Sequence, residues 1–211
     1  MKWSIFNSIL ALITLMPLSV KASDSQYDKH VKHYQRFWDR LIPRYGKVQF
    51  AGSMGLLSMG PGWDYGKHKQ WETDVYLGFV PKYSSSDNKI TFTLKQNYIP
   101  WSLPLNEHFS MNPLTVSLYF NSILSDKYWV HEPNKYPGGY YGFSTRVRSN
   151  FALGQRVTYH IPDAQRKYLK SITFFYELGT TDVYVASAVS NHYLNLSDII
   201  HLSLGLKMQL F

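Results

Sequence analysis

The sequence contains no cysteine. Disulfide bonds, thiolate metal ligands and lipid attachment through a cysteine are therefore excluded. Beyond residue 22, no apolar run approaches the roughly 20 residues that a membrane-spanning helix needs. Aromatic residues are instead abundant, with 17 Tyr, 12 Phe and 6 Trp interleaved with polar residues. This load is typical of a secreted carbohydrate-binding β-domain, or of the interfacial girdles of a membrane barrel.

Residues 1–22 have the pattern of a secretory signal peptide. Lys2 is followed by the mainly apolar run 3–18, and Val20-Lys21-Ala22 ends the stretch with small residues. A positively charged N-terminus, a short apolar stretch and small residues at the cleavage site indicate a cleaved signal peptide rather than a membrane-spanning helix. We expect cleavage after Ala22, which lowers the formal net charge from +8 to +6 because Lys2 and Lys21 are removed.

Residues 23–45 are predicted to form an amphipathic helix that ends near Pro43. Apolar residues, Tyr34, Phe37 and Trp38 among them, recur at three- and four-residue spacing, and the other face is rich in Lys and Arg. Two interpretations stay open. The helix lies in a membrane interface with Tyr34, Phe37 and Trp38 among the lipid headgroups, or it packs on its own barrel.

From residue 46 to the end, apolar and polar residues alternate with the period of two that is typical of β-strands. The last such stretch, 199–211, is about as long as a tilted strand needs to cross a bilayer. Seven others precede it: 48–56, 71–79, 90–98, 114–121, 128–132, 146–160 and 171–178. Residues 182–191 are predicted as a short helix, because a ninth strand would give an odd count and bacterial barrels have even counts.

The connections between these stretches alternate in length. The segments 84–88, 125–127 and 162–166 are short, whereas 59–69, 101–113, 133–139 and 179–197 are longer. Membrane barrels have short periplasmic turns and longer outer loops. The sequence therefore predicts the first group on the periplasmic side and the second group outside.

A signal peptide, alternating strands and an aromatic C-terminal residue together resemble the small outer-membrane β-barrel proteins of gram-negative bacteria. The resemblance covers the signal peptide and residues 46–211. It implies an all-β fold, an eight-stranded antiparallel transmembrane β-barrel preceded by a short N-terminal amphipathic helix. We expect a monomer in the outer membrane of a gram-negative bacterium, in contact with outer-membrane lipid, lipopolysaccharide and the barrel assembly machinery. No nucleic acid and no cofactor are expected.

Phe211 departs from the pattern of the last strand, because it does not share the parity of Leu210. We expect it either to fold over the rim at the membrane interface or to follow a bulge that shifts the register. At the N-terminal side, His30 and His33 have the spacing of a metal pair but no convincing third ligand. No metal site is therefore predicted.

The polar faces of the strands are expected to line the barrel interior. An eight-stranded barrel is just wide enough for side chains to fill, so a wide channel is not expected. Buried charges need partners, which predicts a network of ion pairs in which the acids near residue 72 meet the arginines of 146–160. By parity the interior holds Glu72, Asp74, Arg146, Arg148, Arg156 and Glu177, together with Lys95, His201 and Lys207.

Three residues are candidates for catalysis. A helix before a small barrel resembles the architecture of the lipid A palmitoyltransferase, which uses a loop histidine and an Asp-Ser pair. His68 lies in the first predicted outer loop, but the Asp-Ser pair is missing and Ser125-Asp126 is reversed. The stretch containing His108 and Ser110 matches the His-x-Ser part of the lipid A deacylase pattern, without an acid placed to orient the histidine.

The sequence thus predicts an integral outer-membrane barrel with a structural, adhesive or lipid-contacting role, and an enzyme is the less favoured interpretation. Three alternatives stay open. The first is a lipid A-modifying deacylase or acyltransferase, the second is a secreted carbohydrate-binding β-domain, and the third is a narrow channel for small ions or an apolar solute.

Overall fold

The structure is a computed structural model that describes residues 26–82, 87–124, 146–190 and 199–210. The chain divides into two units, residues 1–42 and 43–211. The predicted signal peptide, the predicted strand at 128–132 and Phe211 lie outside the described residues.

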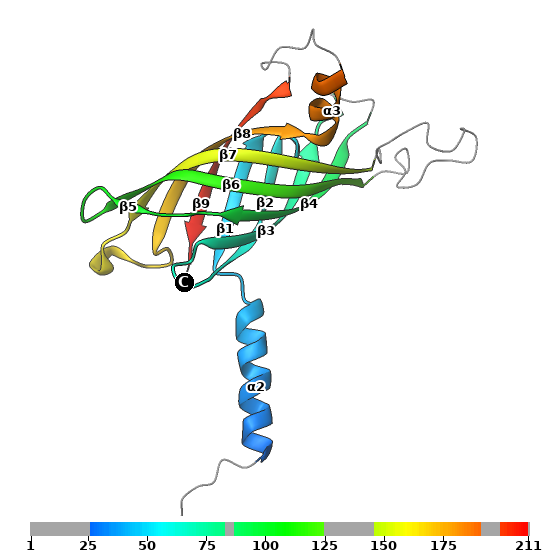
Figure 1. Cartoon of the computed structure of the whole chain (residues 1–211). Helices are drawn as coiled ribbons and strands as arrows, with labels where there is room; N and C mark the ends of the chain where they lie inside the picture. The colour runs from blue at the N-terminus through cyan, green and yellow to red at the C-terminus, as the bar shows by residue number, and fades with distance from the viewer. Residues whose placement is uncertain (1–25, 83–86, 125–145, 191–198, 211) are drawn as a thin grey trace, which may run out of the picture. The chain divides into compact units, whose positions relative to one another are not determined.

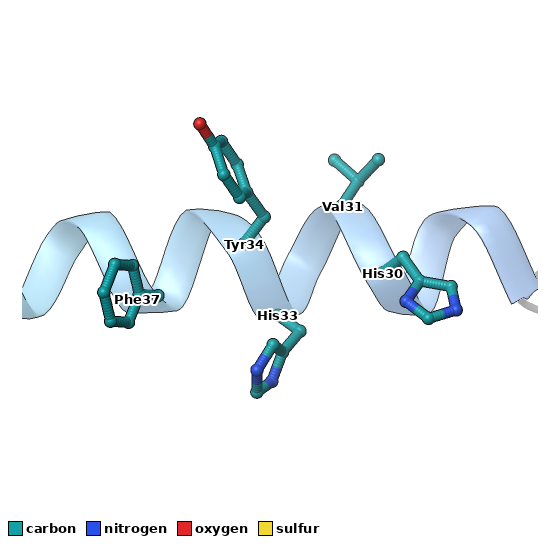
Figure 2. Close-up of a pocket in the computed structure, with 5 residues that line it drawn as sticks. All are labelled: His30, Val31, His33, Tyr34 and Phe37. Carbon is teal, nitrogen blue, oxygen red and sulfur yellow. The ribbon is translucent and has the colours of Figure 1, made fainter.

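The first unit contains the helix α2, Gln26–Leu41. None of its side chains is buried, and its aromatic residues are more than half exposed, with values of 61% for Tyr34, 54% for Phe37 and 51% for Trp38. Figure 2 shows Val31 and Tyr34 projecting from one side of the helix and His33 from the other. In the described part of the chain, no helix combines the length and apolar character that crossing a membrane requires.

The second unit is a closed antiparallel barrel of eight long strands (Figure 1). The strand β1 pairs with β2 on one side and with β9 on the other, and β4 pairs with β6, so the ring has no open edge. The two-residue β5 pairs with β6 alone. The elements are β1 Tyr45–Ala51, β2 Leu57–Tyr65, β3 Trp71–Val80, β4 Lys89–Tyr98, β5 Leu103–Pro104, β6 Phe109–Leu124, β7 Val147–His160, the 3-10 turn Asp163–Gln165, β8 Ser171–Thr181, α3 Asp182–Ser190 and β9 His201–Gln209.

The strands bury their polar faces and expose their apolar faces. In β4, Phe92 and Leu94 are 41% and 45% exposed, whereas the alternate residues Thr91, Thr93, Lys95 and Asn97 are buried. The same pattern repeats in β3, β8 and β9. The barrel is therefore inverted relative to a water-soluble barrel, whose apolar face points inward.

The predicted loop at 59–69 is wrong over 59–65, because residues Leu57–Tyr65 form the strand β2, and only its last part connects β2 to β3. Its Gly-Pro-Gly stretch has the composition of a turn, but the two glycines allow close approach within the sheet. A Cβ atom on Gly60 would lie 1.7 Å from the carbonyl oxygen of Val75, and one on Gly62 would lie 2.1 Å from the ring of Tyr45. Glycine here makes room for neighbouring strands rather than for a bend.

The additional strand changes which connections share an end of the barrel. We call the end that holds Tyr45, Tyr98, His160 and Gln209 the C-terminal rim, and the other end the opposite rim. The ends of β3 and β4 that the predicted turn 84–88 joins lie at the opposite rim, whereas residues 162–166 lie at the C-terminal rim, so these two predicted turns do not share one end. Likewise, residues 101–108 lie at the C-terminal rim, whereas β8 ends at the opposite rim, so the connections that follow β4 and β8 do not share one end as predicted. The predicted helix in this last connection is confirmed over Asp182–Ser190, as α3 at the opposite rim (Figure 1).

Candidate functional site in the barrel lumen

The turn between β1 and β2 plugs the lumen near the opposite rim. Met54 in this turn is fully buried and packs against Tyr76, Tyr119 and Ala152, which project inward from three other strands. The turn can double back because Gly52 adopts a positive φ of 79°, a conformation that glycine reaches without steric cost.

Hydrogen bonds from the barrel wall hold this plug in place. The hydroxyl of Thr91 donates to the carbonyl oxygen of Met54, and the amide of Asn121 donates to that of Ser53. The hydroxyl oxygen of Ser53 also lies 3.1 Å from Nε2 of His201. The plug is therefore anchored to β4, β6 and β9 through the polar groups that a buried turn must satisfy.

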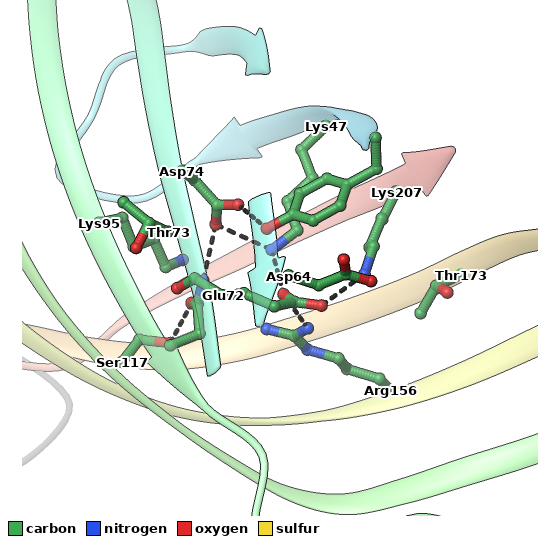
Figure 3. A network of polar contacts seen from close by, with 12 residues as sticks. Lys47, Asp64, Glu72, Thr73, Asp74, Lys95, Ser117, Arg156, Thr173 and Lys207 are labelled. Atoms are coloured by element: carbon green, nitrogen blue, oxygen red, sulfur yellow. Dashed lines mark hydrogen bonds and ion pairs between the residues drawn. The ribbon is translucent and has the colours of Figure 1, made fainter. Parts of the chain in front are cut away.

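Two buried lysines face each other across the seam that closes the barrel. Lys47 of β1 is the direct register partner of Lys207 of β9. Like charges directly opposite each other in a sheet are destabilising. The carboxylate of Glu72 compensates them, because it accepts a hydrogen bond from Lys47 Nζ at 2.7 Å and forms an ion pair with Lys207 (Figure 3). Glu72 also accepts a hydrogen bond of 2.6 Å from Arg156 on β7.

Asp74 extends this network along β3. It accepts hydrogen bonds from Lys47 Nζ at 2.8 Å, from the Tyr45 hydroxyl at 2.7 Å and from the Asn97 amide at 2.6 Å. Further along the lumen, Lys95 forms an ion pair with Glu177. Each buried charge in these clusters thus has a counter-charge, as low-dielectric surroundings require.

The charges buried in the described residues balance. Four are acids and four are bases: Asp64, Glu72, Asp74 and Glu177 against Lys47, Lys95, Arg156 and Lys207. An electroneutral network therefore fills the middle of the lumen, which has the character of a structural core rather than of a channel lining.

The predicted lumen charges fall into two groups. Glu72, Asp74, Arg156 and Glu177 lie inside this network. Arg148 lies nearer the opposite rim, with Nη1 4.0 Å from Asp182, and Arg146 directly precedes β7. Lys47 shares the inward parity of Gln49 and belongs to this network, although it is not among the charges predicted for the interior.

A cavity of about 700 Å³ lies at the C-terminal rim. Glu72, Thr173 and Lys207 form part of its lining, so it reaches the charged network. Residues 99–101, Ile-Pro-Trp, form another part of the lining, which also includes Ser110 and His160. The barrel is thus plugged toward one end and hollowed at the other.

Of the three catalytic candidates, Ser110 and His68 line this cavity, whereas His108 does not. The hydroxyl oxygen of Ser110 lies 2.8 Å from Nε2 of His160. The ring of His108 contacts the ring of Tyr159 edge-on instead. The backbone carbonyl oxygen of His108 accepts a hydrogen bond from the backbone N–H of His160. The sequence did not indicate the pairing of Ser110 with His160, because that pairing depends on the register between β6 and β7.

Comparisons with protein-family models, with curated proteins and with solved structures found no match. The function must therefore be inferred from the geometry of the barrel itself. Within the described ranges, no three His, Asp or Glu side chains come together in a way that could hold a metal ion.

Proposed function

We propose that the chain is an integral outer-membrane β-barrel protein of a gram-negative bacterium, with a structural and lipid-contacting role. The observation that carries this proposal is the inversion of the barrel. Leu77, Phe120, Leu153 and Leu204 are 57%, 49%, 44% and 39% exposed on four different strands, while eight charged residues are buried inside.

This arrangement is unfavourable in water and favourable in lipid. Water-soluble proteins rarely expose continuous apolar surface, because each buried Å² of such surface contributes about 25 cal/mol. A bilayer removes that penalty, and a closed barrel leaves no strand edge with unsatisfied backbone groups in the hydrocarbon. The secreted carbohydrate-binding domain would need the opposite distribution of the two faces, so the barrel does not support that alternative.

Aromatic residues at the C-terminal rim support the same proposal. Tyr65, Trp71, Tyr98 and Phe109 lie on neighbouring strands at this rim, and all four are exposed. The rings of Trp71 and Tyr98 are in contact, with centroids 4.5 Å apart. Such a band is typical of the girdle where amphipathic rings meet lipid headgroups. We propose the same environment for Tyr34, Phe37 and Trp38 of α2.

The connections suggest an orientation. The two longest, 125–146 and 182–200, join strand ends that lie at the opposite rim, those of β6 and β7 and those of β8 and β9. Since longer loops face the outside in barrels of this kind, we place the opposite rim outside, in contact with lipopolysaccharide, and the C-terminal rim in the periplasm. Ser110 and His160 then face the periplasm, so their position does not favour modification of lipid A in the outer leaflet.

Fractionation and gel migration test the proposal together. We expect the protein in the outer-membrane fraction after urea washing, and a different apparent mass for unboiled and boiled samples on a denaturing gel. Recovery in the soluble periplasmic fraction with identical migration would refute it. In planar bilayers the folded protein is expected to show no stable conductance, because plug and charge network fill the lumen. An unchanged lipid A mass on deletion of the gene separates this role from the lipid A-modifying alternative.

A further inference from the structure

A serine and a histidine share one wall of the cavity at the C-terminal rim. Ser110 Oγ lies 2.8 Å from His160 Nε2, within the range expected for a nucleophile and its general base. Both residues line the cavity of about 700 Å³, so a small molecule inside it can reach the serine.

Paired strands hold the two residues in register. The strand β6 carries Ser110 opposite Thr158 of β7, two residues before His160. The backbone N–H of His160 donates to the carbonyl oxygen of His108 at 2.7 Å, which ties the end of β7 to the start of β6. On its other side, Ser110 is paired with Pro104 of β5. A site on such elements keeps its geometry better than one on a free loop.

We propose that Ser110 and His160 form the nucleophile and base of an esterase site. In the first step Ser110 Oγ attacks the ester carbonyl carbon while His160 Nε2 takes the hydroxyl proton. The tetrahedral intermediate collapses, the C–O bond to the alcohol breaks, and the alcohol leaves with that proton. Water then attacks the acyl-serine with His160 as base, which releases the carboxylic acid and restores the serine.

The cavity determines the class of ester. Its apolar wall is the short stretch Ile99, Pro100 and Trp101, held in part by a hydrogen bond of 3.2 Å from the Asn112 amide to the Trp101 carbonyl. Most of the remaining lining is polar or charged, with Lys170 adding a positive charge that can attract the developing oxyanion. A short acyl group on a polar alcohol, such as an O-acetylated sugar, matches this lining. A long acyl chain does not.

The histidine has no carboxylate hydrogen-bonded to it among the described residues. A pair of this kind lacks the group that orients the base in a complete triad, so slow turnover is expected. The esterase proposal does not rest on membrane insertion, because the cavity and the pair belong to the barrel in any environment.

The test uses the folded full-length protein in detergent. We expect a fluorophosphonate probe to label the wild type, with the modified peptide containing Ser110 by mass spectrometry. Hydrolysis of p-nitrophenyl acetate should fall about 10²-fold or more in Ser110→Ala and in His160→Gln, as removal of a nucleophile or general base predicts. Unboiled gel migration checks that each variant is folded.

A second serine–histidine pair supplies the matched control. Ser53 lies 3.1 Å from His201 Nε2 near the opposite rim, outside the cavity, so Ser53→Ala should keep full activity and labelling. An unlabelled, inactive wild type overturns the proposal, and so does undiminished labelling of a folded Ser110→Ala variant. Faster hydrolysis of p-nitrophenyl palmitate than of the acetate overturns the short-chain assignment in favour of a lipid ester.

Discussion

Replacement of Glu72 by Gln should destabilise the barrel strongly. The variant keeps the size of the side chain but removes one of the four buried negative charges, so the described interior changes from neutral to a net charge of +1. Glu72 is the common counter-ion of Lys47, Lys207 and Arg156. Asp74 can still compensate Lys47, at 2.8 Å, but Arg156 and Lys207 lose the carboxylate that they bind.

The size of the effect follows from the burial of these cations. Removal of one partner from a buried ion pair typically costs about 3–5 kcal/mol, because the other charge stays buried without compensation. Glu72, Lys47 and Arg156 have side chains no more than 3% exposed, so solvent screening does not reduce this cost. The repulsion between Lys47 and Lys207 then acts directly on the seam between β1 and β9. We therefore expect a loss of about 3–5 kcal/mol in the free energy of unfolding.

Urea unfolding of the protein in lipid vesicles, followed by tryptophan fluorescence, measures this loss. The exposed Glu107→Gln has the same chemistry outside the network and should change the free energy of unfolding by no more than about 0.5 kcal/mol. The double variant Glu72→Gln, Lys207→Gln restores neutrality and should recover part of the loss. Equal stability of Glu72→Gln and Glu107→Gln would refute the assignment of Glu72 as the compensating charge of the seam.

Three further variants test other features. Leu94→Arg, in the middle of β4 and 45% exposed, should lower stability in vesicles by about 2–4 kcal/mol if this face meets lipid. The control Tyr168→Arg, 85% exposed and outside the strands, should not lower it. Equal effects of the two variants would contradict a lipid-facing belt. Gly205→Val should prevent folding, because a Cβ there lies 2.3 Å from the ring of Phe175, while Gly46→Ala meets nothing within 4 Å and should give the normal unboiled gel band. Met54→Ala should lose about 2–5 kcal/mol in urea unfolding, and a loss below about 0.5 kcal/mol would show that the plug is not packed.

The alternation of residue types predicted the barrel wall well because inward and outward positions follow a fixed period along every strand. The alternation did not reveal the strand β2, because Gly60 and Gly62 have no side chains that would mark these positions as polar and inward-facing. The turn-like composition of that stretch reflects close packing with Val75 and Tyr45, which are distant in sequence. Since each strand reverses the chain direction, this omission reversed the ends predicted for the connection between β3 and β4 and for that between β4 and β6.

The candidate site was less predictable than the wall. Parity alone indicated that Glu72 and Arg156 both point inward, but the contact between them depends on the shear of the closed ring. The pairing of Ser110 with His160 depends likewise on the register of β6 against β7. The alternation along one strand assigns each residue to the inner or the outer face. It does not give the register between strands, which decides which residues of different strands meet.

The seam between the first and the last strand has a consequence for the order of assembly. Lys47 and Glu72 leave the ribosome early, whereas Lys207, the last cation bound by Glu72, comes with the final strand. Until β9 arrives, β1 has an unpaired edge from Tyr45 to Ala51. The ring therefore cannot close before β9 has been synthesised, and Glu72 then gains its ion pair with Lys207 as β9 pairs with β1. A chain truncated before β9 would keep an open edge for a chaperone or protease to recognise.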